Sequence, residues 1–172
     1  MKYVIMTGVV AAAVLLAGCG KKSSSSESSA ELSSLPALQP ALTAFRSGDK
    51  STAIADFLAV DWSVHPLVQA GSPLSHSDDQ MKALRAHSEA DYHAESKALS
   101  SQLLNLIRLT GAVRDAGNDA VSKGDIAQAR KDFTSLKQCG AALDKPDYTR
   151  AVQSVGRNCV KEADAGLAKI RQ

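Results

Sequence analysis

The stretch GDIAQARKDF, residues 124–133, repeats a pattern already present in GDKSTAIADF, residues 48–57. Gly, Asp, Ala, Asp and Phe stand at the same offsets, and the two copies start 76 residues apart. Glycine commonly ends a helix in the left-handed conformation, and aspartate commonly caps the next helix. Alanine then allows close helix packing, and phenylalanine four residues later lies on the same face. The pattern predicts one helical turn built twice, from Gly48, Asp49, Ala53, Phe57, Gly124, Asp125, Ala129 and Phe133.

The chain after residue 35 has the composition of a helical protein. Ala, Leu, Lys, Gln, Arg and Glu dominate it, and alternating β-branched residues are scarce. Pro40 either weakens the middle of the first helix or marks its first turn. We therefore predict an all-α fold, a compact bundle of five or six helices, over about residues 36–46, 51–59, 77–84, 89–121, 126–143 and 148–170.

The repeated stretches resemble the tetratricopeptide repeat. The second copy matches its small, turn and large-aromatic positions with Gly117, Ala120, Gly124, Ala129 and Phe133, and the first with Ala44, Gly48, Ala53 and Phe57. The early aromatic and closing proline positions depart from the family, and the copies lie farther apart than its period of about 34 residues. The resemblance implies two helical hairpins that bind a protein or peptide. The alternative is that Gly-Asp is simply a good boundary between helices.

The N-terminal stretch MKYVIMTGVVAAAVLLAGC, residues 1–19, has the order of a secretory signal peptide. Lys2 supplies the positive charge, an uncharged run covers residues 3–16, and small residues follow. The run is shorter than the roughly 20 apolar residues of a transmembrane helix. The tetrad that ends in Cys19 resembles the lipobox of bacterial lipoproteins. The alternative is an ordinary secreted protein with a chance cysteine at the cleavage site.

The lipobox resemblance implies cleavage before Cys19, a diacylglycerol on its thiol, and attachment to the cell envelope outside the cytoplasmic membrane. Gly20 follows, in place of the aspartate that retains such proteins at the inner membrane, so in a Gram-negative host we expect the outer membrane, facing the periplasm. Residues 20–34 are rich in serine and poor in large apolar groups, which predicts a disordered tether. The domains expected are a signal peptide (1–18), the lipidated cysteine with its linker (19–34) and a helical domain (35–172).

The charge balance argues against a nucleic-acid partner. The chain has 20 Lys and Arg against 18 Asp and Glu, and only Lys2 is lost with the signal peptide. A nucleic-acid or anionic-surface binder would need a clustered basic face. The partners expected are therefore the membrane, through the lipid, and an envelope protein or peptide.

Cys139 and Cys159 form an even pair in a chain predicted to be exported, where such pairs are often oxidised. A hairpin that turned at residues 144–147 would place Cys159 about 12 Å beyond Cys139 along the helix. A disulfide requires Cα atoms within about 7 Å. Three possibilities stay open: the last helix starts late, it crosses steeply, or both cysteines are free.

Few residues suggest catalysis or metal binding. The stretch 72–79 contains serine, histidine and aspartate, and His87, Asp91 and Glu95 share a helix face near His93. Caps and solvated polar faces are the more common roles of such groups. We therefore predict no catalytic residue, no metal site, no cofactor and no enzymatic activity. An enzyme would need one of these clusters to converge with a distant partner.

Trp62, the only tryptophan, opens the long connection at residues 61–76. A lone tryptophan can anchor a partner or close the end of a helical core. The residues predicted to contact a partner are Asp61, Trp62, His65 and Leu67. The function expected is a non-enzymatic interaction module. The alternative is a passive structural, small-ligand or cell-wall-associated lipoprotein with any pocket near Trp62.

Overall fold

Six α-helices and a short 3-10 helix form the regular structure of residues 37–64 and 67–171, the ranges described by this computed structural model. These ranges contain no strand, so the predicted all-α bundle is confirmed. The signal peptide, Cys19, the serine-rich linker and His65 lie outside the described residues. The elements are α2 (Gln39–Arg46), α3 (Lys50–Leu58), η1 (Pro73–Ser75), α4 (Asp78–His87), α5 (Glu89–Ser122), α6 (Ile126–Leu143) and α7 (Arg150–Lys169).

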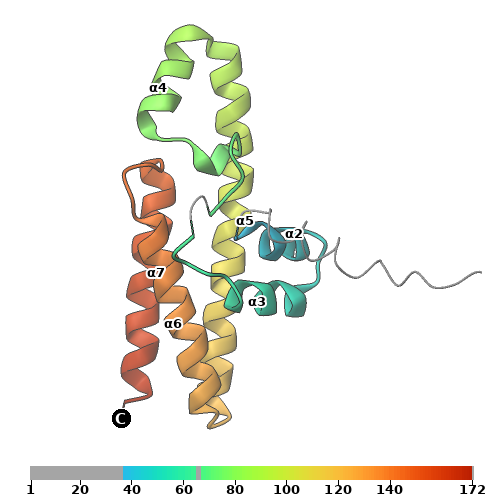
Figure 1. Cartoon of the computed structure of the whole chain (residues 1–172), viewed down its shortest axis with the longest axis vertical. Coiled ribbons are helices and arrows are strands. Elements are labelled where there is room, and N and C mark those ends of the chain that lie inside the picture. The colour runs from blue at the N-terminus through green and yellow to red at the C-terminus, as the bar shows by residue number, and fades with distance from the viewer. Residues whose placement is uncertain (1–36, 65–66, 172) are drawn as a thin grey trace, which may run out of the picture. The chain divides into compact units, whose positions relative to one another are not determined.

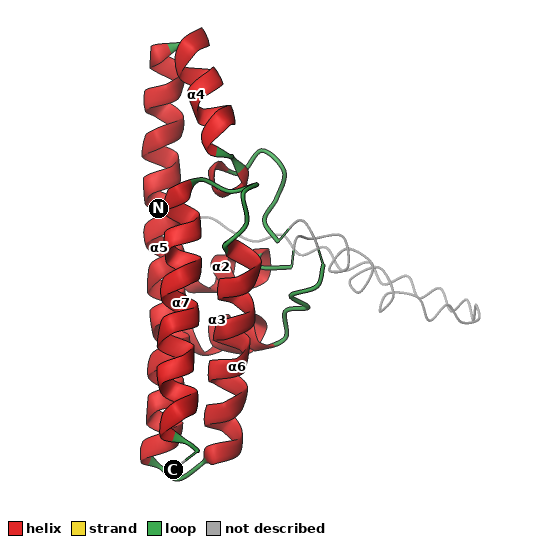
Figure 2. Cartoon of the chain, turned by 90° about the vertical axis from the view of Figure 1, so that its left-hand side faces the viewer, coloured by secondary structure: helices red, strands yellow, loops and turns green. Residues whose placement is uncertain are grey.

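The long helix α5 is the axis of the helical unit at residues 34–172 (Figure 1). Helices α6 and α7 run beside its second half as an antiparallel pair, and α4 folds back along its first turns (Figure 1). The short helices α2 and α3 pack against its middle, as the rotated view also shows (Figure 2). This arrangement leaves grooves where α6 meets α3 and where α7 meets α5.

The predicted helix boundaries agree closely with the structure. The range 126–143 coincides with α6, and the break near residues 87–88 separates α4 from α5. Ser77 caps α4 through the predicted capping box, in which Gln80 N donates to Ser77 Oγ and Ser77 N donates to Gln80 Oε1. Pro40 lies in the first turn of α2, where a missing N–H costs nothing.

The repeated Gly-Asp stretches form the same turn twice. Gly48 has φ 87° and Gly124 has φ 75°, both in the left-handed region. Asp49 N donates to Ala44 O at 3.1 Å, and Asp125 N donates to Ala120 O at 2.9 Å. Each carboxylate also accepts the backbone N–H three residues later at 3.0 Å, from Thr52 and Gln128 respectively. Both turns therefore close one helix and start the next with the same hydrogen bonds.

The helices joined by the two turns differ greatly in length. The first turn joins helices of 8 and 9 residues, whereas the second joins helices of 34 and 18 residues. Ala53 and Ala129 are both fully buried, as are Phe57 and Phe133. The shared turn and its buried positions are therefore structural facts, while the tetratricopeptide relationship stays a prediction.

Phe133 of α6 fills the space where α5, α6 and α7 meet. A Cβ atom added to Gly117 of α5 would lie 2.9 Å from Phe133 Cζ. One added to Gly166 of α7 would overlap the same ring. The ring can be buried at this position only because both neighbouring helices present a residue without a side chain.

Candidate functional site

Trp62 packs against the core and also lines a surface groove. Its ring is half-buried against Phe57, with centroids 4.9 Å apart and planes inclined by 60°. Its Nε1 donates a hydrogen bond to Ser135 Oγ of α6 at 3.1 Å. The side chain therefore packs against the edge of the core. The rest of its surface lines a groove.

This groove, which we call the Trp62 groove, runs between the end of α3 and the exposed face of α6. It has a volume of about 340 Å³. Its floor is apolar near α3, and its far wall is formed by polar and basic side chains of α6. The lining residues are Leu58, Val60, Trp62, Ala127, Arg130, Lys131, Thr134, Ser135 and Gln138.

The charge of the Trp62 groove is positive. Arg130 and Lys131 are exposed on its wall, and its lining includes no Asp or Glu. Neither cation forms an ion pair with another described residue. An apolar floor beside two exposed cations suits a ligand with both apolar and acidic groups.

The other residues predicted to contact a partner lie in different surroundings. Asp61 is exposed, and its carboxylate accepts hydrogen bonds from Ser63 Oγ at 2.6 Å and Ser63 N at 3.0 Å, which lower its pKa. Leu67 is fully buried, and its carbonyl accepts from Leu38 N at 2.9 Å. Leu67 therefore belongs to the core, because the loop returns to the bundle after Trp62 and leaves this side chain inaccessible to a partner.

A second depression, near the start of the bundle, is mainly polar. It encloses about 410 Å³ between α2, the loop before η1 and α5. Ser72 Oγ donates to Gln102 Oε1 at 2.8 Å across its floor. Its polar side chains are Gln39, Arg46, Gln69, Ser72, Gln102 and Asn105. No sequence pattern indicated this site, because its residues come from three separated segments that meet only in the fold.

The two polar clusters weighed as catalytic or metal-binding groups meet at one point. His76 Nε2 lies 3.0 Å from Glu95 Oε1, and both side chains are about one quarter exposed. The neighbouring hydroxyls have other roles, since Ser75 Oγ donates to Ser72 O and Ser77 Oγ caps α4. The pair thus holds the loop against α5. Among the described residues, no nucleophilic side chain is hydrogen-bonded to the His76 ring.

No three His, Cys, Asp or Glu side chains in residues 37–64 and 67–171 are grouped so that they could hold a metal ion. Within the same ranges, none of the helices combines the length and the apolar character needed to span a bilayer.

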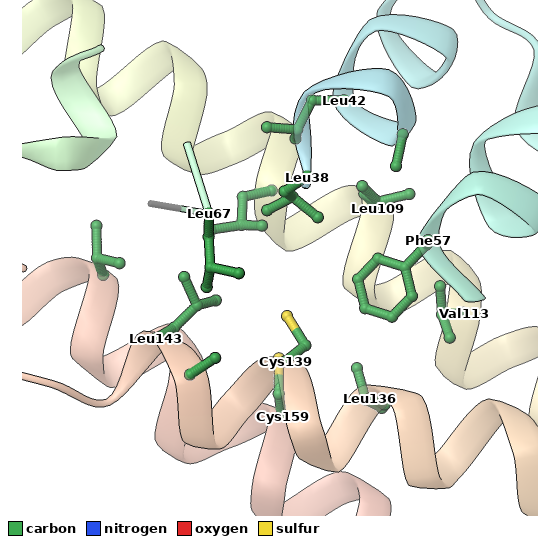
Figure 3. Close-up of a cluster of buried hydrophobic side chains, with 14 of the residues drawn as sticks. Leu38, Leu42, Phe57, Leu67, Leu109, Val113, Leu136, Cys139, Leu143 and Cys159 are labelled. Atoms are coloured by element: carbon green, nitrogen blue, oxygen red, sulfur yellow. The ribbon is translucent and has the colours of Figure 1, made fainter. Parts of the chain in front are cut away.

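Cys139 and Cys159 lie side by side in the core (Figure 3). Both are unbonded thiols in this structure, and the pKa of each is affected by the other. The expected separation of about 12 Å is wrong because α7 starts late, at Arg150, which moves the centre of the turn toward Thr149. Of the open possibilities, the structure shows two together: the last helix starts late, and both cysteines are free.

Comparison with known proteins returned no relative for this chain. No protein-family model matches it, and neither a curated protein nor a solved structure matches it.

Proposed function

We propose that this protein is a lipid-anchored protein of the cell envelope whose helical domain binds an acidic, partly apolar segment of a protein partner. No catalytic step and no cofactor enter this function. The observation that carries the proposal is the Trp62 groove, in which an aromatic edge and an apolar floor lie beside the two exposed cations Arg130 and Lys131. Partly exposed tryptophan and arginine are common anchors of protein interfaces.

The proposed occupant follows from the charge of the groove. Arg130 and Lys131 would attract Asp or Glu side chains, while Leu58, Val60 and Trp62 would cover neighbouring apolar groups. The groove, of about 340 Å³, is open to solvent and can accept an extended or helical peptide segment.

The membrane anchor is supported by the sequence alone. Cys19 ends the lipobox-like tetrad, and Gly20 favours the outer membrane in a host with two membranes. One acyl chain binds a membrane only reversibly, whereas two or more hold it stably. The serine-rich residues 20–34 would keep the helical domain off the bilayer, with an r.m.s. reach on the order of 20 Å.

Photocrosslinking in the native envelope tests the binding site. A photoreactive amino acid replaces Thr134, an exposed residue of the groove, and in a second strain it replaces Ala165, an exposed residue of α7 outside it. We expect a defined adduct from position 134 only, with mass spectrometry locating the crosslink in a segment rich in Asp or Glu. The double charge reversal Arg130→Glu, Lys131→Glu should abolish the adduct.

The matched control is Lys161→Glu, which reverses an exposed charge on α7 and should leave the adduct intact. Absence of an adduct at position 134, an adduct at both positions, or a crosslink that survives the double reversal would each contradict the proposed site. A crosslink to a basic segment would contradict the proposed occupant.

Metabolic labelling with an alkyne fatty acid tests the anchor separately. The label should enter the full-length protein and be lost in Cys19→Ala, whereas Cys159→Ala should retain it. A label that persists in Cys19→Ala, or is absent from the wild type, would overturn the lipid anchor and leave the groove proposal standing.

A second candidate function rests on the polar depression at α2 and α5. Amide side chains of Gln39, Gln69, Gln102 and Asn105 can donate and accept hydrogen bonds, which suits a hydroxyl-rich small ligand such as a cell-wall glycan. Pull-down by purified peptidoglycan should then weaken in Gln102→Leu. Equal recovery of the wild type and the variant, or no recovery of either, would argue against this function.

A further inference from the structure

The close approach of α6 and α7 brings the two buried cysteines together. A Cβ atom added to Gly140 would lie 2.5 Å from Gly156 O, and one added to Gly156 would lie 2.7 Å from Gly140 O. The backbones can therefore come this near only because both residues lack side chains. Cys139 is one residue before Gly140, and Cys159 lies one helical turn after Gly156, so both thiols occupy this contact (Figure 3).

We propose that Cys139 and Cys159 are a dithiol that closes into an intramolecular disulfide joining α6 to α7, and that exchange enters through Cys159. A purely apolar role is the alternative, since free cysteine is commonly buried as a small hydrophobic residue. The pairing of the two thiols, and the access described next, distinguish them from isolated core cysteines. Among the described residues no further metal-ligating group joins them, so they do not form a metal site there.

The route of entry is a groove between α5 and α7. This groove, of about 430 Å³, is lined by Cys159 and by Leu103, Ile107, Thr110, Arg114, Val155 and Glu162, whereas Cys139 lies outside the lining. Cys159 is 2 % exposed and Cys139 is fully buried. A small disulfide can therefore reach Cys159 from the groove with a modest movement of its walls, and Cys139 lies behind it.

The pKa values of the two thiols are shifted in opposite directions, which also favours Cys159 as the point of entry. Burial raises the pKa of Cys139. Hydrogen bonding from the Cys139 thiol lowers the pKa of Cys159, and the Thr110 hydroxyl contributes in the same direction. The attacking species in exchange is the thiolate, so Cys159 is the better first nucleophile.

The exchange uses an external disulfide as the oxidant. The Cys159 thiolate attacks one sulfur of this disulfide, which breaks its S–S bond and releases one external thiolate that takes up the Cys159 proton. Cys139 then loses its proton and attacks the Cys159 sulfur, which releases the second external thiol. The protein has lost two hydrogens, and the external disulfide has been reduced to two thiols.

Peptide mapping of the full-length protein tests the disulfide without any substitution. Trypsin cleavage after Lys137 and Arg157 places Cys139 and Cys159 on different peptides, and Cys19 on a third. Samples are alkylated before unfolding, once after extraction from the envelope and once after equilibration of reduced protein with oxidised glutathione. We expect a linked Cys139–Cys159 peptide pair in both, which separates on reduction.

Comparison of the two samples distinguishes failure of the disulfide proposal from failure of the proposed envelope location. A linked pair with oxidised glutathione but free thiols in the envelope would support the dithiol and count against export to an oxidising compartment. Alkylated, unlinked peptides in both samples would overturn the dithiol, whatever the location of the protein.

Single variants test the route through Cys159. With oxidised glutathione, Cys139→Ser should form a mixed disulfide at Cys159, whereas Cys159→Ser should stay unmodified at Cys139 over the same time. Far-UV circular dichroism establishes that each variant is helical. Modification of Cys139 in Cys159→Ser at an equal or faster rate would overturn the route, and so would an unreactive, folded Cys139→Ser.

Discussion

Trp62 Nε1 and Ser135 Oγ, separated by 73 positions in the sequence, form a hydrogen bond of 3.1 Å that ties the loop after α3 to the middle of α6. The bond holds the indole against Phe57 while its outer edge lines the groove. One side chain therefore packs against the core and lines the groove. A substitution of Trp62 would disturb both, so reversal of the exposed charges of Arg130 and Lys131 is the sharper test of the proposed binding site.

The Trp62–Ser135 bond should be measurable as a coupling between the two residues. Trp62→Phe keeps an aromatic ring but removes the donor, and Ser135→Ala removes the acceptor, so each should lower the free energy of unfolding by about 1 kcal/mol. The double variant should lose less than the sum of the two. Trp62 is the only tryptophan, so its replacement removes the fluorescence signal. Denaturant unfolding is therefore followed by far-UV circular dichroism. Strictly additive losses would contradict the coupling.

Gly166→Ala should destabilise the bundle because its Cβ would overlap the buried ring of Phe133. We expect a loss of about 1–3 kcal/mol, which is typical of overpacking. Gly111→Ala is the matched control, since its added Cβ would lie no closer than 4.0 Å to a neighbouring side chain, at Arg114 Nη2. That change should stabilise α5 by up to about 1 kcal/mol through helix propensity. Thermal unfolding compares the two, and equal shifts would show that Phe133 does not restrict this contact.

Alanine in place of Gly48 or Gly124 should cost about 1 kcal/mol each, because both positions have positive φ. A Cβ atom would meet no atom within 4 Å at either site, so the cost is conformational and not steric. Asparagine, which tolerates the left-handed region better, should recover part of the loss. Chemical denaturation of the single and double alanine variants should give additive losses. An asparagine variant less stable than alanine would argue that the turn conformation is not the cause.

Asp132 should make the bundle less stable as pH rises. Its carboxyl is buried, and burial raises its pKa above the ordinary value of 3.8, although Gln128 Nε2 donates to it at 2.7 Å. The folded chain therefore holds this proton more tightly than the unfolded chain. The associated stability is complete below the ordinary pKa and is lost as pH rises through the raised folded value.

The variant Asp132→Asn keeps an oxygen acceptor for Gln128 and removes the charge. Its Tm should exceed that of the wild type at pH 7, and the difference should shrink as pH falls toward about 4. Thermal melts across this range provide the measurement. A variant that is less stable than the wild type at pH 7 would show that the ionised carboxylate stabilises the fold.

The helices and their boundaries could be predicted because their causes are local. Gly48 and Gly124 end helices, and Ser77 with Gln80 starts one, through hydrogen bonds between residues close in sequence. Hydrophobic spacing likewise indicated the buried faces that include Phe57 and Phe133. The lipobox-like Cys19 also depends only on neighbouring residues, and its lipidation remains a prediction of the sequence.

The positions of the candidate sites could not be predicted because they depend on contacts between distant segments. Leu67 was expected at a binding surface, but the return of the loop to the bundle buries it. Whether Cys139 and Cys159 would meet was left open by the sequence, and the late start of α7 brings them together.

The sequence by itself determined the helical class, the two Gly-Asp turns and the features that predict export, since each follows from short-range geometry and composition. Only the tertiary structure decided which faces meet. It placed Arg130 and Lys131 beside Trp62, and it placed Cys159 on the groove with Cys139 behind it. Helix packing depends on side-chain shape at each crossing, such as the facing glycines at positions 140 and 156, and no local pattern specifies which crossing will form.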